Sequence, residues 1–137
     1  MKNINLNSDI GEGFGVYDIG NDTEMLKIVN SANIACGFHA GDPNVMDRVV
    51  KQSIKNGVSI GAHPGFNDLW GFGRRQIHMS TDEIEASVAY QIGALQAISA
   101  TNNAIVTHVK PHGALNNMSS LDPAIATAIA RGVNLVD

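Results

Sequence analysis

The stretch HVKPHG, residues 108–113, places two histidines and one lysine within five positions, directly after an apolar run. Imidazole exchanges protons near neutral pH, and in its neutral form it also binds divalent metals. A lysine beside it supplies positive charge that can hold an anionic substrate or stabilise negative charge developing in a transition state. His108, Lys110 and His112 are therefore candidates for acid–base or metal chemistry.

Side chains capable of similar chemistry follow three other apolar runs of the chain. They are Asp9 and Glu12 after residues 4–8, His39 and Asp42 after residues 32–36, and His63, Asp68, Arg74 and Arg75 after residues 58–62. Each of them taken singly has a structural explanation, such as a loop hydrogen bond, and Asp42 fits a helix N-cap equally well. Explanations of single residues do not account for reactive side chains that gather after four separate apolar runs. This gathering indicates one shared pocket.

The apolar runs alternate with helical patterns. Strands are predicted at residues 4–8, 32–36, 58–62, 104–109 and 133–137, and helices at residues 21–29, 42–57, 80–102 and 122–132, with residues 110–117 as a loop. The Asp-Pro pair at Asp42 predicts a helix N-terminus, and both Asn21 and Ser80 have a glutamate three residues later, in capping-box spacing. Gly57 and Gly132 are the predicted ends of two of these helices.

Strands that alternate with helices predict a parallel sheet, because parallel neighbours need a crossover connection between them. The strands are rich in Ile, Val and Ala, so we expect both faces of the sheet to be covered. We find no linker, and we predict a single β/α domain over residues 1–137. Functional side chains of such folds gather at the carboxyl ends of the strands, where the runs above place four of the five histidines. The fifth, His78, is assigned to surface structure.

Composition excludes several classes of protein. The formal net charge is −4 and the nine lysines and arginines are scattered, which argues against a nucleic-acid surface. No apolar run approaches the ~20 residues of a membrane-spanning helix, and the polar amino terminus does not resemble a signal peptide. The single cysteine, Cys36, excludes an internal disulfide and is typical of a reducing compartment. We expect a soluble cytoplasmic protein with no nucleic-acid or membrane partner.

Four long strings of this sequence resemble the LamB/YcsF family, whose members are 5-oxoprolinase A subunits. They are SANIACGFHAGDP (31–43), GVSIGAHPGFNDLWGFGRR (57–75), YQIGAL (90–95) and HVKPHGAL (108–115). Their order and spacing match over essentially the whole chain. The resemblance implies an α/β fold, namely a distorted parallel β/α barrel related to the glycoside hydrolase/deacetylase barrels, incomplete in this chain.

The resemblance also implies an activity. With two partner subunits, B and C, such a protein cleaves 5-oxo-L-proline to L-glutamate while ATP is hydrolysed, so ATP, accompanied by Mg²⁺, is the expected co-substrate. On positions that match the family's motifs, we assign proton transfer or water orientation to Asp9, Glu12, His39, His63 and His112, and substrate binding to Lys110, Arg74, Asp42 and Asn33. Asp9, His39 and His63 are also candidates for a metal site.

Two substitutions and the length of the chain depart from the family. Asn5 stands where the family usually has aspartate, and Asn116 where it has tyrosine, which puts activity in doubt if either family residue contacts substrate. Family members have the length of a full β/α barrel, about 250 residues. We therefore expect the N-terminal part of a longer barrel. A pair of chains that together complete one barrel, and an inactive remnant, are the alternatives.

Two other functions are left open by the sequence. A metal-dependent deacetylase or amidohydrolase acting alone is suggested by the related barrels and the Asp/His cluster, and metal content would separate it from the first hypothesis. A truncated, non-catalytic binding module is suggested by Asn5 and Asn116, and it predicts partner binding that survives the loss of His112. ATP binding is not placed, because the chain has no G-x-x-x-x-G-K-[ST] loop and GEGFG (11–15) is too short and acidic to be one.

Overall fold

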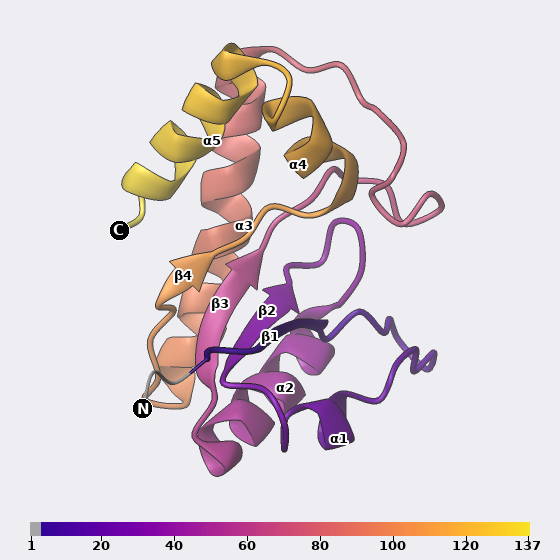
Figure 1. Ribbon diagram of the computed structural model, residues 1–137, viewed down its shortest axis with the longest axis vertical. Coiled ribbons are helices and arrows are strands. Elements are labelled where there is room, and N and C mark those ends of the chain that lie inside the picture. The colour runs from indigo at the N-terminus through magenta and orange to yellow at the C-terminus, as the bar shows by residue number, and fades with distance from the viewer. Residues whose placement is uncertain (1–3) are drawn as a thin grey trace.

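The computed structural model describes residues 4–137 (Figure 1). Its centre is a parallel sheet of four strands in the order β1-β2-β3-β4. The elements in chain order are β1 (Asn7–Ile10), α1 (Asp22–Met25), β2 (Ser31–Ala35), α2 (Pro43–Asn56), β3 (Ser59–His63), α3 (Thr81–Thr101), β4 (His108–Val109), α4 (Gly113–Ser119) and α5 (Pro123–Asn134). The predicted parallel α/β fold is confirmed.

Strands that are neighbours in the sheet are also neighbours along the chain. Right-handed crossovers between strands that always add on the same side place their helices on one face of the sheet. Figure 1 shows α2 and α3 together behind the strands. This one-directional winding is that of an incomplete β/α barrel, and within residues 4–137 it leaves the other face of the sheet without a covering helix.

The two faces of the sheet differ in polarity, because successive side chains of a strand point to opposite faces. One lateral row of paired residues contributes to the apolar core, and the adjacent row is mostly polar and lies on the helix-free face. The first row is Ile10, Ile34, Ala62 and Val109, and the second is Asp9, Asn33, Gly61 and His108. The expectation that both faces are covered is therefore wrong for the described residues, because the second row offers mostly polar side chains.

Helix α2 forms where the sequence predicts it. The Asp42 carboxylate accepts the backbone N–H groups of Asn44 at 2.8 Å and Val45 at 3.0 Å. It also accepts the N–H of Gly15 at 2.7 Å, which ties the first loop to this helix. Gly57 ends the helix with a left-handed φ of 67°. Asp42 therefore serves as the N-cap that the Asp-Pro pair predicts.

Helix α5 overturns two predictions about the end of the chain. Gly132, predicted to end a helix, lies inside α5, which continues to Asn134, and residues 133–137 form no strand. A Cβ at Gly132 would come within 2.6 Å of the Glu85 carbonyl oxygen and 2.9 Å of Val88 Cβ on α3. Glycine is thus required for the close crossing of two helices and does not break one. An apolar run as short as VNLV does not by itself distinguish a strand from a buried helix end.

Several other predicted boundaries are also wrong. The first strand covers residues 7–10 instead of 4–8, the fourth only 108–109 of 104–109, and the first helix only 22–25 of 21–29. Asn21 makes no side-chain cap, whereas the capping box at Ser80 is present. Residues 113–119, largely predicted as a loop, form α4, because Ala114 and Leu115 are buried in the core. Strand lengths depend on the neighbouring strand, which local sequence does not show.

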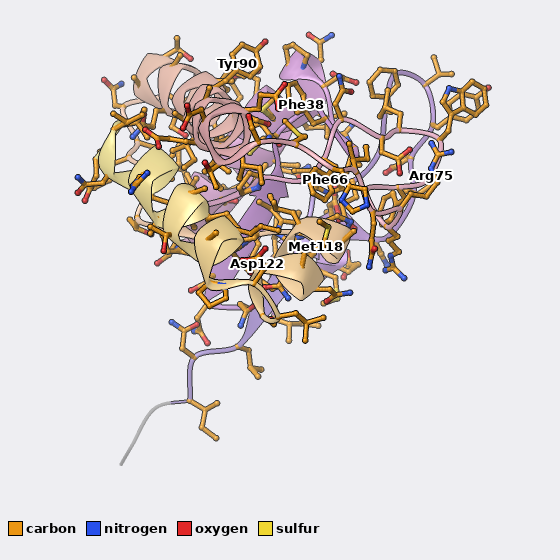
Figure 2. All side chains as sticks on the ribbon, turned by 90° about the horizontal axis from the view of Figure 1, so that it is seen from above. Phe38, Phe66, Arg75, Tyr90, Met118 and Asp122 are labelled. Carbon is orange, nitrogen blue, oxygen red and sulfur yellow. The ribbon has the colours of Figure 1, made fainter. Side chains whose placement is uncertain are left out.

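Loop side chains complete the packing around α3, as Figure 2 shows from above. Phe38 stacks on Tyr90 of α3 with ring centroids 5.4 Å apart. Phe66 is buried in the core, whereas Arg75 lies at the outer edge of the molecule (Figure 2).

No helix within residues 4–137 is both long enough and apolar enough to cross a membrane.

Gly93 and Gly132 form a matched pair for testing the crossing of α3 and α5, because both lie inside helices. We expect Gly132→Ala to destabilise the fold by ~1–3 kcal/mol, the range for overpacking a close contact. The Cβ position of Gly93 has nothing within 4 Å, so Gly93→Ala should stabilise by up to ~1 kcal/mol through helix propensity. Urea unfolding measures both changes. A Gly132→Ala variant as stable as Gly93→Ala would contradict the close crossing.

Cys36 offers a chemical test of the core. The residue is 2% exposed, and burial raises the pKa of its thiol to about 12. Because the thiolate is the reacting form, we expect the folded chain to resist alkylation by iodoacetamide at mildly alkaline pH. The same reagent in concentrated urea should label the residue completely. Mass spectrometry follows both reactions, and rapid labelling without urea would show that this part of the core is open.

Candidate active site

Three buried histidines and one glutamate meet where the strands end. Glu12 follows β1, His39 follows β2, His63 is the last residue of β3, and His112 immediately precedes α4. One side-chain nitrogen or oxygen of each lies within 4.8 Å of those of the other three. The histidine side chains are at most 5% exposed, whereas that of Glu12 is 19% exposed. Glu12 is therefore the member of the cluster with most access to solvent.

Backbone carbonyls orient two of the three rings. Nδ1 of His63 donates to the Lys110 carbonyl, and Nε2 of His112 donates to the Phe72 carbonyl at 2.8 Å. A carbonyl oxygen only accepts, so each of these ring nitrogens carries a hydrogen. The other nitrogens of the two rings, Nε2 of His63 and Nδ1 of His112, are 3.0 Å apart. The backbone thus fixes which nitrogen of each ring faces the cluster.

His39 lies against the face of His112. The ring centroids are 3.7 Å apart with the planes 3° from parallel, and Nε2 of His39 is 3.0 Å from Glu12 Oε1. Two glycines leave room for this ring. A Cβ at Gly73 would come within 2.6 Å of His39 Cβ, and a Cβ at Gly65 within 2.8 Å of His39 Nδ1. The glycines of AHPGF and WGFGRR are therefore required by the packing of the site.

Burial favours the neutral form of two of these imidazoles. It lowers the pKa of His39, although the hydrogen bond with Glu12 opposes this shift. Burial also lowers the pKa of His112 to about 4, and the charge of a protonated His39 beside it adds to the effect. Neutral imidazole nitrogens accept protons or bind metal ions at physiological pH. Both kinds of chemistry are thus open to the cluster.

Asp9 and Lys110 extend the cluster toward solvent. Lys110 Nζ is 2.6 Å from Asp9 Oδ1, and Asp9 Oδ2 is 3.3 Å from His63 Nε2. Asn33 also donates to Asp9 Oδ1 at 3.0 Å. Burial raises the pKa of Asp9, but the contact with His63 and the hydrogen bonds from Lys110 and Asn33 outweigh burial and hold that pKa well below its usual value. Asp9 is therefore an ionised carboxylate at neutral pH.

A cavity of about 250 Å³ lies beside the cluster. Its lining combines two cations with a carboxylate, two imidazoles and polar side chains. The residues include Asp9, His63, Arg74, Lys110, His112, Asn116 and Asn117. Such a cavity suits a small substrate with an anionic group, because the cations can hold that group while ring nitrogens move protons.

The structure brings together the five residues predicted to be catalytic, which are Asp9, Glu12, His39, His63 and His112. Of the residues predicted to bind substrate, Lys110 and Arg74 line the adjacent cavity and Asn33 contacts Asp9. Asp42 is not brought to this place, since its carboxylate is occupied by backbone N–H groups at the start of α2. Of the predicted metal candidates, His39 and His63 belong to the group with converging ligand atoms, and Asp9 contacts that group through His63.

His108, from the motif that suggested the site, lies apart from the cluster on the helix-free face. Its Nε2 is 3.1 Å from Asn33 Oδ1, and a Cβ on Gly61 would overlap its ring. A cavity of about 500 Å³ covers this face, and Asn5 lines it as well. Asn116 lines the smaller cavity, so both departures from the family pattern lie at cavities.

Asp68 pairs with Arg75 away from the imidazoles, and its carboxylate accepts the N–H of Gly71 in the same turn.

Gln91 is a supporting residue that the sequence did not reveal. It lies on α3, fully buried, where its Oε1 accepts the Gly65 N–H at 2.9 Å and its Nε2 donates to the Gly65 carbonyl at 3.0 Å. These bonds fix the loop that packs against His39. The available signal was a glutamine on the mostly apolar buried side of α3. The Phe72 carbonyl had no such signal, because it is a backbone group.

Comparisons with known proteins agree with the fold. The family model described as LamB/YcsF family matches residues 4–137. Proteins named as the A subunit of 5-oxoprolinase, from Natranaerobius thermophilus and Geobacillus kaustophilus, are 57% and 58% identical over 137 residues, which is all of this chain and 53% of each relative. The crystal structure of the lactam utilization protein from Thermus thermophilus matches with a TM-score of 0.97 at 46% identity, over 99% of this chain and 55% of that one.

The chain therefore spans about half the length of the curated relatives that it matches. The family match covers all of the described residues, and it includes the strings that build the histidine cluster. The chain belongs to the LamB/YcsF family.

Proposed function

We propose that the chain carries the proton-transfer and substrate-binding groups of a 5-oxoprolinase A subunit, which opens the lactam ring of 5-oxo-L-proline to give L-glutamate. The observation that carries this proposal is the cavity where Lys110 and Arg74 lie beside imidazoles and a carboxylate. The substrate has a carboxylate next to a cyclic amide. A site for it needs a cation for the first group and proton donors and acceptors for the second. The names of the close relatives support the same substrate.

Ring opening forms a C–O bond from water to the lactam carbon and breaks the ring C–N bond. The electron pair of that C–N bond passes to nitrogen, which takes a proton. In this proposal the inward nitrogens of His63 and His112, which border the cavity, accept the proton of the attacking water and return it to the leaving nitrogen. Lys110 pairs with the negative charge of the carbonyl oxygen or of the phosphoryl group that this oxygen carries, and Arg74 binds the substrate carboxylate.

Coupling to ATP has a chemical reason in this proposal. A lactam is a stable amide, and transfer of a phosphoryl group from ATP to its oxygen makes the ring carbon easier to attack. We assign that step to partner subunits B and C, with ATP entering as its Mg²⁺ complex, because this sequence contains no Walker-type phosphate loop. On this chain, water then attacks the phosphorylated ring carbon and the C–N bond breaks, which leaves an acyl phosphate, and a second water cleaves that acyl phosphate to L-glutamate and free phosphate.

A hydrolase that opens an unactivated amide without partner subunits is the second candidate. The convergence of Glu12, His39, His63 and His112 favours it, because all of these groups come from this one chain. The two candidates differ in a simple observable. The first requires ATP and the partner subunits for turnover, and the second requires neither.

Glu12→Gln and His112→Asn should each lower kcat by ~10²–10⁴, the range for loss of a general acid or base. The measurement is L-glutamate formed from 5-oxoproline and ATP in the presence of subunits B and C. The chain is assayed as it stands and also joined to the C-terminal half of the Geobacillus kaustophilus relative. Activity in the joined protein only would mean that groups of the other half complete the site.

His78→Asn is the matched control, because it makes the same chemical change at an exposed histidine outside the cluster. It should leave turnover unchanged, and circular dichroism should show that all variants are folded. If folded His112→Asn turns over as fast as the unchanged protein, the proton-transfer role of His112 is wrong. Partner binding that persists in that variant while no version shows turnover would favour a binding module.

Arg74→Met should raise KM for 5-oxoproline about tenfold or more, since a hydrogen bond to a charged group contributes ~1.5–3 kcal/mol. The proposal places Arg74 on the non-reacting carboxylate, so kcat should change little. Lys51→Met is the control, because Lys51 is exposed on α2 and pairs there with Asp47. Steady-state kinetics separates the two parameters. An unchanged KM in Arg74→Met would remove this residue from the substrate site.

A further inference from the structure

Two ring nitrogens of the histidine cluster point inward, and in the neutral rings each of them carries a lone pair and no hydrogen. Nε2 of His63 and Nδ1 of His112 are the nitrogens that do not donate to backbone carbonyls, and they lie 3.0 Å apart. In neutral rings both of these nitrogens are acceptors. Two acceptors at this distance repel each other unless a positive charge lies between them.

Carboxylate oxygens surround the same point. Glu12 Oε1 is 3.6 Å from His112 Nδ1 and 3.9 Å from His63 Nε2. Asp9 Oδ2 is 3.3 Å from the same His63 nitrogen. These oxygens are acceptors as well, so they donate no hydrogen to the two inward nitrogens. One cation at the centre would satisfy both nitrogens together with Glu12 Oε1, while Asp9 stays paired with Lys110 and Asn33.

His39 contributes a further nitrogen. Its Nε2 lies 3.0 Å from Glu12 Oε1, and its ring is stacked on that of His112. Its Nδ1 is buried and has no hydrogen-bond partner within residues 4–137. No backbone carbonyl fixes the tautomer of His39. In the contact with Glu12 its Nε2 carries the hydrogen, so ion binding would move that hydrogen to Nδ1 and free the Nε2 lone pair. The ring would also turn out of its stack with His112, because an imidazole lone pair lies in the plane of the ring.

The spacing of these atoms fits a small transition-metal ion. Zn²⁺ binds nitrogen and oxygen ligands tetrahedrally at ~2.0–2.2 Å, which places ligand atoms roughly 3.3 Å apart. The separations above between Glu12 and the three histidines, and between His63 and His112, run from 3.0 to 3.9 Å, and all four ligand atoms lie within 4.8 Å of one another. Three imidazoles with one carboxylate suit zinc, whereas Mg²⁺ and Ca²⁺ prefer oxygen ligands throughout.

We propose that Glu12, His39, His63 and His112 form a binding site for one divalent transition-metal ion of the zinc class. The outer nitrogens of His63 and His112 donate to backbone carbonyls, which is the arrangement that orients imidazole ligands in metal sites. Asp9, held by Lys110, lies next to the ligand set and is not part of it. The proposal rests on the geometry of the cluster, and it stands whichever amide the chain acts on. In the loaded chain the inward lone pairs of His63 and His112 would be ligands, so the ion would supply the activation of water that the proposed function assigns to these nitrogens in the metal-free chain.

Metal binding is measured directly and not through turnover. The purified chain is stripped with a chelator, dialysed, and titrated with Co²⁺, whose visible absorption reports coordination geometry. Zn²⁺ is titrated separately by calorimetry. We expect one ion per chain, absorption typical of tetrahedral Co²⁺, displacement of Co²⁺ by Zn²⁺, and a higher melting temperature for the loaded chain, because an ion that binds only the folded state stabilises it.

His63→Asn and Glu12→Gln each remove one ligand. They should weaken Zn²⁺ binding by more than the ~10–100-fold that the loss of an outer-shell partner costs. His78→Asn and His108→Asn remove an imidazole outside the cluster and should leave the affinity unchanged. If a ligand variant does not fold, X-ray absorption spectroscopy of the loaded, unchanged chain still counts the ligands, and it should find three imidazoles with one carboxylate.

A stripped, folded chain that takes up neither Zn²⁺ nor Co²⁺ would overturn the proposal, and a proton shared between His63 and His112 would then explain their contact. Binding that survives His63→Asn and Glu12→Gln but is lost in His78→Asn or His108→Asn would overturn it as well. Metal binding at the cluster without 5-oxoproline turnover would support the site and contradict the proposed function. The two proposals therefore fail separately.

Discussion

Parallel pairing in chain order is the constraint on which the other features of this molecule depend. Because β2, β3 and β4 each add beside the preceding strand, the crossover helices share one face and the carboxyl ends of the strands lie side by side. The register that pairs Ala35 with His63 places the loop after β2 next to the end of β3. Loops distant in sequence thus deliver Glu12, His39 and His112 to one point, and the helix-free face is left polar.

Burying three imidazole rings removes their nitrogens from water, and the surrounding loops compensate for this. A buried imidazole nitrogen needs a partner, and the carbonyls of Phe72 and Lys110 provide one each. Gly65 and Gly73 leave the space that the His39 ring fills, and Gln91 fixes the loop behind it. Much of the loop sequence therefore supports the four side chains of the cluster. This explains why the motif strings are long although few of their residues reach the cavity.

Elements with strong local signals were predictable, and elements that depend on partners were not. The caps of α2 and α3 form as the sequence indicates, because a cap involves neighbouring residues only. The run VNLV was assigned to a strand, yet it forms the end of α5 and the residues after it. Helix α5 packs against α3, and the two helices come closest at Gly132. Helix α4 was largely taken for a loop because Gly113 opens it and its burial depends on the core.

By itself, the sequence determined the alternation of strands and helices, the family, and the loops that carry the reactive side chains, because periodicity, capping residues and motif strings are properties of neighbouring residues. Only the tertiary structure decided which of those side chains meet. It joined the three buried histidines to Glu12, made Asp42 a helix cap, and left His108 on the polar face of the sheet. It also decided which ring nitrogens face inward, because that choice depends on backbone carbonyls contributed by distant segments.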